Sequence, residues 1–395
     1  MYIFLDNIEY GLIPVVVNME TTGFTIDKER LLMLKEELVK TKLSIEAKFP
    51  KSSTDKKGIK SILTSPQQLR KYMIDQGYKE ELATYATYNQ TPSIDKLVLK
   101  RMVQSVPMCK DILEYREISK LLSTYVEPMG NENMWRGNFN QCGTITGRFS
   151  SSRPNLQNIP ARTVLGRRIR ECLKARPGYK LIVSDLSQIE PRLYAFFSQD
   201  RKLLNIYQSH GDFHTDVTKT IYGLNGTPPT KDQRFVGKTV GLATLYGAGT
   251  DKLTDTLVKY GVFLKDSEVN QIRNKIKLQY RDASNWYWRY RTQSFKTGYI
   301  DTLLSRRIPM IPGMNPVNTR IQASCADVIK VCMLNIHKAG YSIIATVHDE
   351  VICEVEEYLA GQAARAISSI MEQSIRLRGM DLKTDTSICD NWGQK

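Results

Sequence analysis

Two acidic stretches of this sequence follow apolar runs with the character of buried strands. The run Leu181–Val183 leads to Asp185, with Glu190 five residues further on, and the run 342–347 leads to Asp349. Carboxylates at the end of an apolar strand cost desolvation free energy unless a cation or hydrogen-bond donors compensate. Two aspartates that meet on one sheet edge would suit Mg²⁺, which prefers oxygen ligands, and two such ions about 3.5–4 Å apart can clamp an in-line phosphoryl transfer. The two stretches therefore predict a site for two Mg²⁺ ions at Asp185 and Asp349.

Residues 227–249 predict a helix with one basic face. Thr230 and Gln233 form a capping-box pattern at its start, and the interior Gly237 and Gly241 predict a close approach by another group. Four side chains spaced four residues apart share one face of this helix: Arg234, Lys238, Leu242 and Tyr246. Two cations followed by an aliphatic and an aromatic side chain suit an elongated ligand with phosphates at one end and a base at the other. An ordinary amphipathic helix with scattered cations has the same pattern.

The charge balance is the most informative part of the composition. The 395 residues include 56 Lys and Arg against 41 Asp and Glu, a formal net charge of +15. This excess favours a polyanionic partner, most commonly nucleic acid, although a basic surface can also serve solubility alone. No apolar stretch is long enough to cross a bilayer, and the acidic start is unlike a secretory signal. The seven scattered cysteines, never in CxxC spacing, are typical of a reducing compartment such as the cytoplasm, without a disulfide framework or zinc site.

The other patterns organise the chain around these stretches. Residues 27–47 and 111–126 show apolar positions at helical spacing, and the lysine-rich residues 48–60 predict a loop suited to a phosphate backbone. Residues 137–180 form an irregular pattern rich in Ser, Asn, Gln and Arg. Residues 341–355 are typical of two strands joined by a turn, and by themselves also fit an ordinary exposed hairpin with an acidic tip.

The segment NMETTGF, residues 18–24, is similar to the DxETTG signature of some proofreading exonucleases. Asn18 stands in place of the first carboxylate, so half of the metal pair is missing. Too few residues separate this segment from the helix expected near Asp27 to hold a nuclease domain. We therefore expect a loop here and no exonuclease activity.

Four motifs together resemble the family A DNA polymerases, the bacterial DNA polymerase I type. SDLSQIEPR, RFVGKTVGLATLYG and VHDEV are similar, in order and spacing, to motifs A, B and C of that family, and TGRFSSSRPNLQNIP (residues 146–160) is a fourth match. The resemblance runs from about residue 10 to the final NWGQK. It covers the polymerase region and leaves out the exonuclease domain that usually precedes it.

The resemblance implies an α+β fold shaped as a right hand, with an antiparallel-sheet palm, helical fingers and a helical thumb. It also implies a division into an N-terminal segment 1–26, a thumb 27–115, a first part of the palm 116–200, fingers 201–300 and a second part of the palm 301–395. The lysine-rich loop then falls in the thumb, where the family grips the duplex. Lys56 and Lys57 of this loop are therefore expected to contact DNA.

The resemblance also implies roles for the acidic and basic residues. Asp185, Asp349 and the backbone carbonyl of Leu186 would hold two Mg²⁺ ions, for which Mn²⁺ can substitute. Glu350 would lie beside these metals, and Lys238 would act as general acid to pyrophosphate, which completes the implied catalytic set. The implied nucleotide contacts are Gln188, Glu190, His214, Arg234, Lys238, Leu242 and Tyr246.

Further matches imply sugar selection and DNA contacts. Glu190 would be the steric gate, filling the space that a ribose 2′-hydroxyl needs. Contacts in the minor groove test base-pair geometry, because the acceptors there are common to all correct pairs. The implied DNA contacts are Arg148, Asn155, Gln157, Arg162, Asn318, Gln322, His348, Lys56 and Lys57. Arg306 is implied as a further phosphate or active-site contact.

Four positions depart from the family pattern. Leu242 stands where Phe or Tyr usually faces the incoming sugar, which leaves discrimination against dideoxynucleotides open. Leu186 replaces a tyrosine, Pro191 an aliphatic residue and Met314 an arginine. None of these changes removes a group that catalysis needs.

We therefore predict a template-directed DNA polymerase of replication or repair that adds dNTPs to a primer 3′-hydroxyl without intrinsic 3′–5′ proofreading. The expected partners are primer–template DNA, dNTPs, a separate exonuclease and replisome proteins, with a monomeric chain and no membrane contact. A single-subunit RNA polymerase would share the metal aspartates but needs a small residue in place of Glu190. An inactive nucleic-acid-binding replication factor would have lost a metal aspartate or Lys238.

Overall fold

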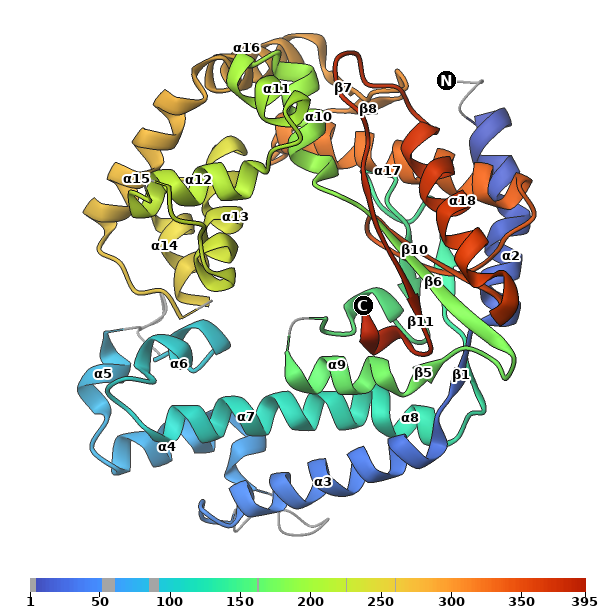
Figure 1. Cartoon of the computed structure of the whole chain (residues 1–395). Helices are drawn as coiled ribbons and strands as arrows, with labels where there is room; N and C mark the ends of the chain where they lie inside the picture. The colour runs from blue at the N-terminus through green and yellow to red at the C-terminus, as the bar shows by residue number, and fades with distance from the viewer. Residues whose placement is uncertain (1–4, 52–60, 85–91, 162, 225, 260) are drawn as a thin grey trace. The chain divides into compact units, whose positions relative to one another are not determined.

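The computed structural model describes residues 5–51, 61–84, 92–161, 163–224, 226–259 and 261–395. The chain divides into two compact units, each of which is described by itself. The first unit contains residues 1–27, 132–253 and 266–395, and the second contains residues 28–131 and 254–265. Figure 1 shows the elements of both units.

The second unit is built from helices (Figure 1). The helix predicted over residues 27–47 is confirmed as α3 (Lys28–Glu46), which buries leucines along one face. The helix predicted over residues 111–126 is confirmed as α7 (Met108–Leu121), which continues into the π-helical turn η4 (Leu122–Val126). The other elements of this unit are η3 (Ile62–Thr64), α4 (Pro66–Asp75), α5 (Lys79–Ala83), α6 (Lys96–Met102), α8 (Glu127–Gly130) and the last part of α14 (Thr250–Lys259).

The first unit is organised around a four-stranded antiparallel sheet with the strand order β11–β6–β10–β9. The strands are β6 (Tyr179–Leu186), β9 (Ser342–Val347), β10 (Glu350–Glu356) and β11 (Thr384–Cys389). Helix α18 (Ala360–Gln373) packs on β6 and β11, whereas α2 (Ile13–Thr22) and α17 (Pro316–Lys338) pack on β9. Residues 181–184 of β6 are completely buried as a result. Each buried aliphatic side chain contributes about 1.5–3 kcal/mol, so the middle of β6 firmly anchors the strand end that carries Asp185.

Shorter strands and further helices complete the first unit. Strand β1 (Phe24–Ile26) pairs with β2 (Met134–Trp135) and β5 (Leu173–Lys174), and two hairpins are formed by β3 (Asn138–Asn140) with β4 (Ser150–Ser152) and by β7 (Tyr299–Asp301) with β8 (Arg307–Pro309). The helices are α9 (Val164–Glu171), α10 (Ile189–Ser198), α11 (Arg201–Gln208), α12 (Phe213–Tyr222), α13 (Lys231–Leu245), α15 (Asp266–Gln279) and α16 (Arg281–Thr297). The short turns are η1 (Leu5–Glu9), η2 (Tyr10–Leu12), η5 (Leu156–Asn158), η6 (Glu357–Leu359) and η7 (Trp392–Gln394).

The prediction of a loop for NMETTGF, residues 18–24, is wrong. Residues 18–22 are the last residues of α2, and Phe24 begins β1 after a turn at Gly23, whose φ is 65°. The Asn18 amide donates hydrogen bonds to Ser342 Oγ (2.9 Å) and to the Ile343 carbonyl (2.7 Å). Asn18 therefore fastens α2 to β9.

Helix α13 begins with the predicted capping box. Thr230 Oγ1 accepts from the Gln233 backbone N–H, and the Gln233 side chain accepts from the Thr230 N–H. A Cβ atom built on Gly237 would lie 2.0 Å from Thr218 Oγ1 and 2.8 Å from the His214 carbonyl oxygen, both on α12. The close approach predicted at Gly237 is therefore confirmed, and the approaching group is helix α12.

We expect Gly237→Ala to lower the free energy of unfolding, because the added methyl group must push α12 away at a packing cost toward the upper end of about 1–3 kcal/mol. This cost exceeds the roughly 1 kcal/mol that alanine gains in helix propensity. Thermal unfolding followed by circular dichroism measures the change. Gly249→Ala is the matched control, because no described residue other than its chain neighbours has an atom within 4 Å of its Cβ position. A Gly237→Ala protein as stable as the wild type would contradict the described packing of α12 on α13.

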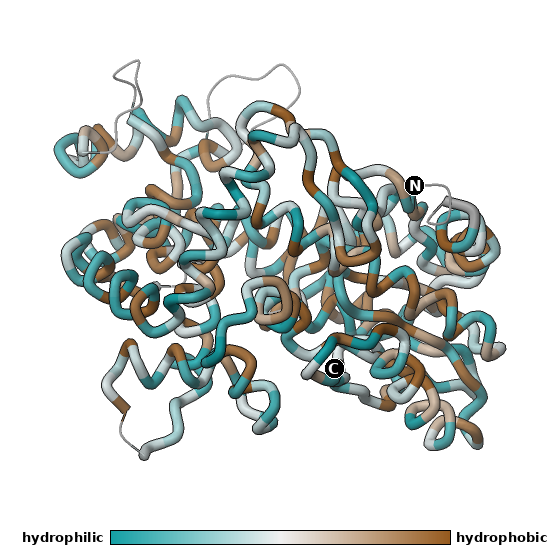
Figure 2. Tube along the Cα trace, turned by 90° about the horizontal axis from the view of Figure 1, so that it is seen from above, coloured by the Kyte–Doolittle hydropathy of each residue, from teal (hydrophilic) through white to brown (hydrophobic). Residues whose placement is uncertain are grey.

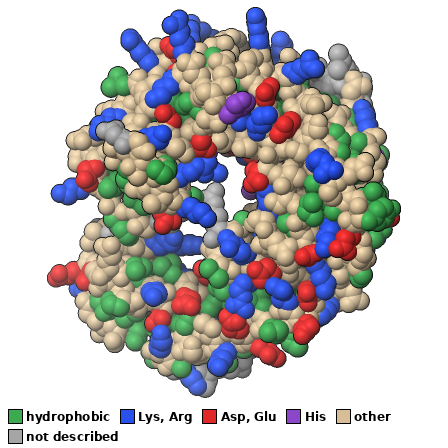
Figure 3. Space-filling model, in the orientation of Figure 1, with side chains coloured by type: hydrophobic (Ala, Val, Ile, Leu, Met, Phe, Trp, Pro, Cys, Tyr) green, Lys and Arg blue, Asp and Glu red, His purple; other side chains and the backbone are tan. Residues whose placement is uncertain are grey.

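Polar and apolar residues are mixed along the chain. Hydrophobic and hydrophilic residues are interleaved along the trace (Figure 2). None of the helices in the described ranges is long and apolar enough to cross a membrane. Lys and Arg side chains are spread over the visible face of the molecule (Figure 3). The excess positive charge is thus not confined to one patch of that face.

Candidate active site

The ends of two neighbouring strands bring the predicted aspartates together. Asp185 is the second-last residue of β6, and Asp349 lies in the turn between β9 and β10. The backbone N–H of Leu186 donates to the Asp349 carbonyl (3.1 Å), which fastens this turn to the end of β6. His348 in the same turn has a φ of 57°, an uncommon conformation for a non-glycine residue. The strand–turn–strand predicted for residues 341–355 is therefore confirmed, and its tip lies beside Asp185.

A cleft of about 440 Å³ opens at these strand ends. Most of the residues predicted for catalysis, metal binding and nucleotide binding line it: Asp185, Leu186, Gln188, Glu190, His214, Lys238, Leu242, Asp349 and Glu350. His348, predicted as a DNA contact, lines it as well. Arg234, on α13 with Lys238, and Tyr246, the C-cap residue of that helix, are not among the residues that line the cleft. Arg170 and Lys395 line it although sequence analysis did not single them out.

Both aspartates hold a proton more tightly than usual. Burial raises the pKa of Asp185 to about 6, and the negative charge of Glu350, its partner across the strands, adds to the rise. Burial also raises the pKa of Asp349 to about 7; Arg148 opposes this rise, whereas Glu190 and Asp185 add to it. Two buried carboxylates that repel each other favour a shared cation, so the pair has the character of a cation site.

The donor set of this site fits Mg²⁺, which takes oxygen ligands and keeps several waters. No group of three or more His, Cys, Asp or Glu side chains that could hold a metal occurs in the described part of the chain. The side chains of Asp185 and Asp349 would therefore need further oxygen ligands. The Leu186 carbonyl, water and substrate phosphates can supply them.

Asp185 has a carboxylate on each neighbouring strand. Glu350 lies opposite it on β10, and Asp385 lies opposite it on β11. Lys395 forms an ion pair with Asp385 (3.1 Å), and its charge opposes the rise in the Asp185 pKa. Like charges directly opposite each other destabilise a sheet, so Lys395 offsets part of that repulsion.

Glu350 is tethered to the C-terminal segment. Trp392 Nε1 donates to Glu350 Oε1 (3.0 Å), and the indole itself is completely buried. Arg170 stacks on one side of this indole, 4.0 Å from the ring centroid, and Phe24 also stacks on it at a centroid distance of 5.3 Å. Glu350 is thus held by a residue that sequence analysis missed, and its place beside Asp185 follows from the strand register.

Both carboxylate oxygens of Glu190, near the start of α10, have a hydrogen-bond donor. Arg148 Nη2 donates to Oε1 (2.7 Å), and the Tyr246 hydroxyl donates to Oε2 (2.7 Å). The same guanidinium lies 3.9 Å from Asp349 Oδ1, so Arg148 bridges two carboxylates. Hydrogen bonds to charged groups contribute about 1.5–3 kcal/mol each, which makes Glu190 a rigid part of the cleft wall.

Arg234 contacts a carboxylate of the chain itself. Its Nε and Nη2 atoms donate to the two oxygens of Asp212 (3.2 and 2.5 Å), and Gln188 Nε2 also donates to Asp212 (2.8 Å). Although burial opposes it, hydrogen bonds from Arg234 and Thr215 hold the pKa of Asp212 below its usual value. Sequence analysis missed Asp212, although an aspartate directly before a helix is a recognisable N-cap.

His214 presents a neutral imidazole to the cleft. The side chain is 3% exposed, and its Nδ1 has no hydrogen-bond partner among the described residues. Burial lowers its pKa to about 3, with Asp212 opposing this effect and the cations Lys238 and Arg234 adding to it. A neutral imidazole keeps one donor and one acceptor, and the unpaired Nδ1 is itself a buried atom.

The predicted DNA contacts lie on several elements of the first unit. Asn155 precedes η5, and Asn318 and Gln322 lie one turn apart on α17. The Oδ1 atoms of Asn155 and Asn318 are buried and have no hydrogen-bond partner within the described part of the chain. Gln157 donates to the Thr346 carbonyl on β9 (3.3 Å). Three predicted contacts lie outside the described residues: Arg162, Lys56 and Lys57.

Comparison with known proteins gives one consistent result. The sequence profile of DNA polymerase family A matches residues 28–394. DNA polymerase I of Chloroflexus aurantiacus is 29% identical over 98% of this chain and 43% of its own length, and the thermostable DNA polymerase I of Thermus aquaticus is 29% identical over 98% and 48%. The chain therefore spans less than half the length of these relatives.

A solved structure shares the fold. The POL domain of Pol1 from M. smegmatis, in complex with DNA primer–template and dNTP, superposes with a TM-score of 0.85 at 25% identity, covering 99% of this chain and 71% of that one. The predicted α+β polymerase fold is confirmed by this superposition, while the residue boundaries given for thumb, palm and fingers stay predictions. With a profile match over most of its residues, the chain belongs to DNA polymerase family A.

Proposed function

We propose that this chain is the polymerase part of a DNA-directed DNA polymerase that adds dNTPs to a primer 3′-hydroxyl by two-metal-ion nucleotidyl transfer. The observation that carries the proposal is the cleft in which Asp185 and Asp349 meet with Lys238 and His214. The similar Pol1 domain, whose complex contains DNA primer–template and dNTP, supports the choice of substrates. The net charge of +15 supports a polyanionic partner.

The two aspartates and the Leu186 carbonyl would hold two Mg²⁺ ions, which Mn²⁺ can replace. The bound ions would lower the pKa of the primer 3′-hydroxyl and neutralise charge on the triphosphate. In the transfer the 3′-oxygen bonds to the α-phosphorus, the bond from that phosphorus to the leaving pyrophosphate breaks, and the hydroxyl proton passes to water. Lys238 Nζ gives a proton to the pyrophosphate as it leaves.

Three further side chains would bind the nucleotide. Neutral His214 donates a hydrogen bond to a phosphate oxygen without adding charge. Arg234 exchanges the Asp212 carboxylate for phosphate oxygens, since both are anions that accept from the guanidinium fork. Tyr246 holds the Glu190 gate and lies at the end of the same helix face, where the base pair would be.

We also propose that this chain does not proofread by itself. Asn18 stands where the exonuclease signature has a carboxylate, and its amide is engaged with Ser342 and Ile343. The separate exonuclease, the replisome partners, the monomeric state and the cytoplasmic location stay predictions that go with this proposal.

Extension of a labelled primer–template with Mg²⁺ tests the proposed function. The wild type should extend with dNTPs and not with rNTPs, and Asp185→Ala should abolish extension. Equal use of rNTPs would favour an RNA polymerase. DNA binding without any extension by the wild type would favour a binding protein and overturn the proposal.

The proposed role of Glu190 as the steric gate leads to a separate prediction. Glu190→Ala is expected to raise rNTP incorporation relative to dNTP incorporation about 10- to 100-fold, because the 2′-hydroxyl no longer meets the overpacking cost of about 1–3 kcal/mol. Tyr246→Phe keeps the carboxylate and removes one of its two donors, so a smaller rise of about 3- to 10-fold is expected. Single-nucleotide addition with matched dNTP and rNTP measures both ratios. A Glu190→Ala enzyme with wild-type sugar selection would rule out Glu190 as the gate.

A further inference from the structure

Arg148 lies in a hairpin tip that borders a pocket. The tip, residues 141–149, connects β3 with β4 and includes Gly147 with a φ of 78°. A pocket of about 380 Å³ lies against the tip. Its apolar lining includes Ile145, Ile308 and Pro309. Arg148 itself does not line the pocket, but Ile145 and Gly147 of the tip do. Side chains that face a pocket lose dispersion contacts on that side, so packing alone holds this part of the tip less firmly.

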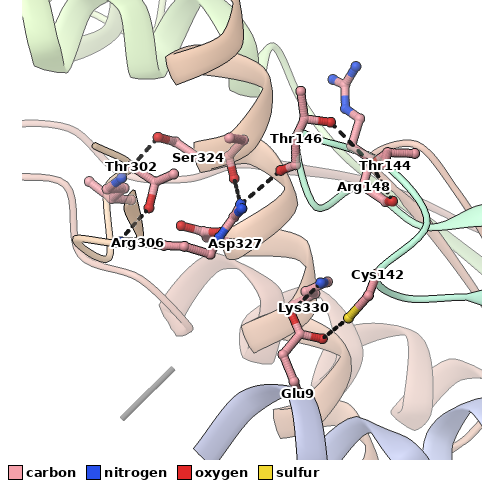
Figure 4. A network of polar contacts seen from close by, with 12 residues as sticks. Glu9, Cys142, Thr144, Thr146, Arg148, Thr302, Arg306, Ser324, Asp327 and Lys330 are labelled. Carbon is pink, nitrogen blue, oxygen red and sulfur yellow. Dashed lines mark hydrogen bonds and ion pairs between the residues drawn. The ribbon is translucent and has the colours of Figure 1, made fainter. Parts of the chain in front are cut away.

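Helix α17 turns a buried polar face toward this tip (Figure 4). Its Ser324 and Asp327 are completely buried, and Lys330 is 1% exposed. The spacing of three residues places these side chains on one side of the helix. Long charged side chains are almost never fully buried unless they are paired, so this face must have partners.

Arg306 joins one end of the tip to this face. Its Nε and Nη2 atoms donate to Asp327 Oδ1 (3.0 and 2.7 Å). Nη2 also donates to the Thr146 carbonyl in the tip (2.8 Å) and to the Ala323 carbonyl on α17 (3.3 Å). A Cβ on Gly147 would lie 2.8 Å from the same nitrogen, so the guanidinium rests directly on the backbone before Arg148. Arg306 is thus engaged within the fold and is not among the residues that line the cleft, and its implied phosphate or active-site contact stays a prediction.

Lys330 joins the other end of the tip to the same helix. Its ammonium forms an ion pair with Glu9 and donates to the Gln141 carbonyl (2.9 Å). The Cys142 thiol donates to the second oxygen of Glu9 (3.8 Å from Sγ). Within the tip, the Thr144 hydroxyl donates to the Arg148 carbonyl (2.8 Å). The backbone of Arg148 is therefore fixed from both sides.

Stability alone is a weak explanation for such pairs. Buried ion pairs can often be replaced by apolar residues of similar volume without loss of stability, because desolvation cancels much of their attraction. Breaking one partner is costly, about 3–5 kcal/mol, so the pairs strongly disfavour any displaced arrangement of the tip. They specify a position more than they stabilise the fold.

We propose that Arg306 and Asp327 are positioning residues that hold the hairpin tip so that Arg148 reaches Glu190 and the primer end. The catalytic part of this inference rests on the proposed function. Displacing a positioned group by about 1 Å can cost about 100-fold in rate. Loosening the tip therefore slows nucleotide addition and weakens rejection of a mispaired primer end, in both cases through Arg148.

Arg306→Gln is expected to lower turnover at saturating dNTP about tenfold, with the KM for dNTP changed less than about threefold. The double variant Arg148→Ala with Arg306→Gln should be no slower than Arg148→Ala alone, because both changes act through one side chain. Arg307→Gln is the matched control: this exposed neighbour stacks on Tyr299 and lines the same pocket, but among the described residues it forms no hydrogen bond or ion pair with the tip or with Asp327. It should keep turnover within about twofold.

A further double variant and a hydrogen-exchange measurement separate an effect on folding from an effect on catalysis. The pair Arg306→Gln with Asp327→Asn leaves no unpaired buried charge, so it keeps the test available should Arg306→Gln fold poorly. Hydrogen exchange without DNA should be at least tenfold faster in the tip amides of this pair, with β6 unchanged. The inference would be overturned if Arg306→Gln lowered turnover by the same factor in the Arg148→Ala protein as in the wild type. Unchanged hydrogen exchange of the tip amides would also overturn it. A wild type that extends no primer would refute the proposed function, and the exchange result would still decide whether Arg306 positions the tip.

Discussion

An Asp349→Asn protein is expected to melt at a higher temperature than the wild type in EDTA at pH 8 and yet to extend no primer. Burial raises the pKa of Asp349 from 3.8 to about 7, so the folded protein binds this proton more tightly than the unfolded chain does. Wild-type stability therefore falls as the pH rises from about 4 through about 7, and the loss is complete above that range. Asparagine has no charge to desolvate and should recover about 1–2 kcal/mol, a figure reduced for a side chain that is 22% exposed.

Turnover is the second readout of this variant. Losing one of two carboxylate ligands should lower the rate about 10³-fold or more, since metal ions contribute several kcal/mol to such transition states. Asp385→Asn is the matched control, because it makes the same change opposite Asp185 at a side chain that is 75% exposed. It should keep turnover within about threefold and the melting temperature nearly unchanged. Extension by Asp349→Asn at more than about a hundredth of the wild-type rate would exclude Asp349 as a metal ligand.

Lys238→Ala is expected to slow nucleotide addition about 10³-fold while primer–template binding stays within about twofold. A positioned general acid contributes roughly 10²–10⁴-fold, and Lys238 lines the cleft with Asp185, Asp349 and His214. Because the proposed role concerns only the triphosphate, the loss should appear at saturating dNTP. Rapid-quench single turnovers measure the rate, and fluorescence anisotropy measures DNA binding.

Two further variants accompany this test: one separates proton transfer by Lys238 from its positive charge, and the other is a control. Lys238→Arg keeps a cation that cannot give up its proton, so dNTP affinity should recover while the rate stays at least about 100-fold low. Lys231→Ala changes an exposed lysine at the start of the same helix and should leave the rate within about twofold. Loss of DNA binding in Lys238→Ala, or a rate within tenfold of the wild type, would contradict the general-acid role.

Local patterns predict those elements whose determinants are contiguous in the chain. The capping box at Thr230 and Gln233 predicted where α13 begins, and the glycines predicted that another group packs close to it. Apolar runs that end in acids predicted β6 and the β9–β10 turn, because buried strands need uninterrupted apolar residues and turns need polar ones. The meeting of Asp185 and Asp349 follows from these two elements once both belong to one sheet.

Contacts between residues far apart in the sequence could not be predicted from local patterns. Asp212 and Trp392 act on Arg234 and Glu350 through tertiary contacts, which have no period and no fixed spacing. Helix α9 was missed within residues 137–180, because it buries only a few residues and carries several arginines. At NMETTGF the likeness to an exonuclease signature obscured the buried Val15 and Met19, which lie four residues apart on α2.

The hydrogen bonds of Glu190 have a consequence for how sugar errors and base errors are distributed among the extended primers. The carboxylate proposed to inspect the sugar is bonded to Tyr246, at the proposed base pair, and to Arg148, at the proposed duplex contact. One displaced side chain would relax the inspection of sugar and of base in the same event. Misincorporated ribonucleotides and mismatched bases should then be statistically correlated, found together in the same additions more often than independent failures would allow.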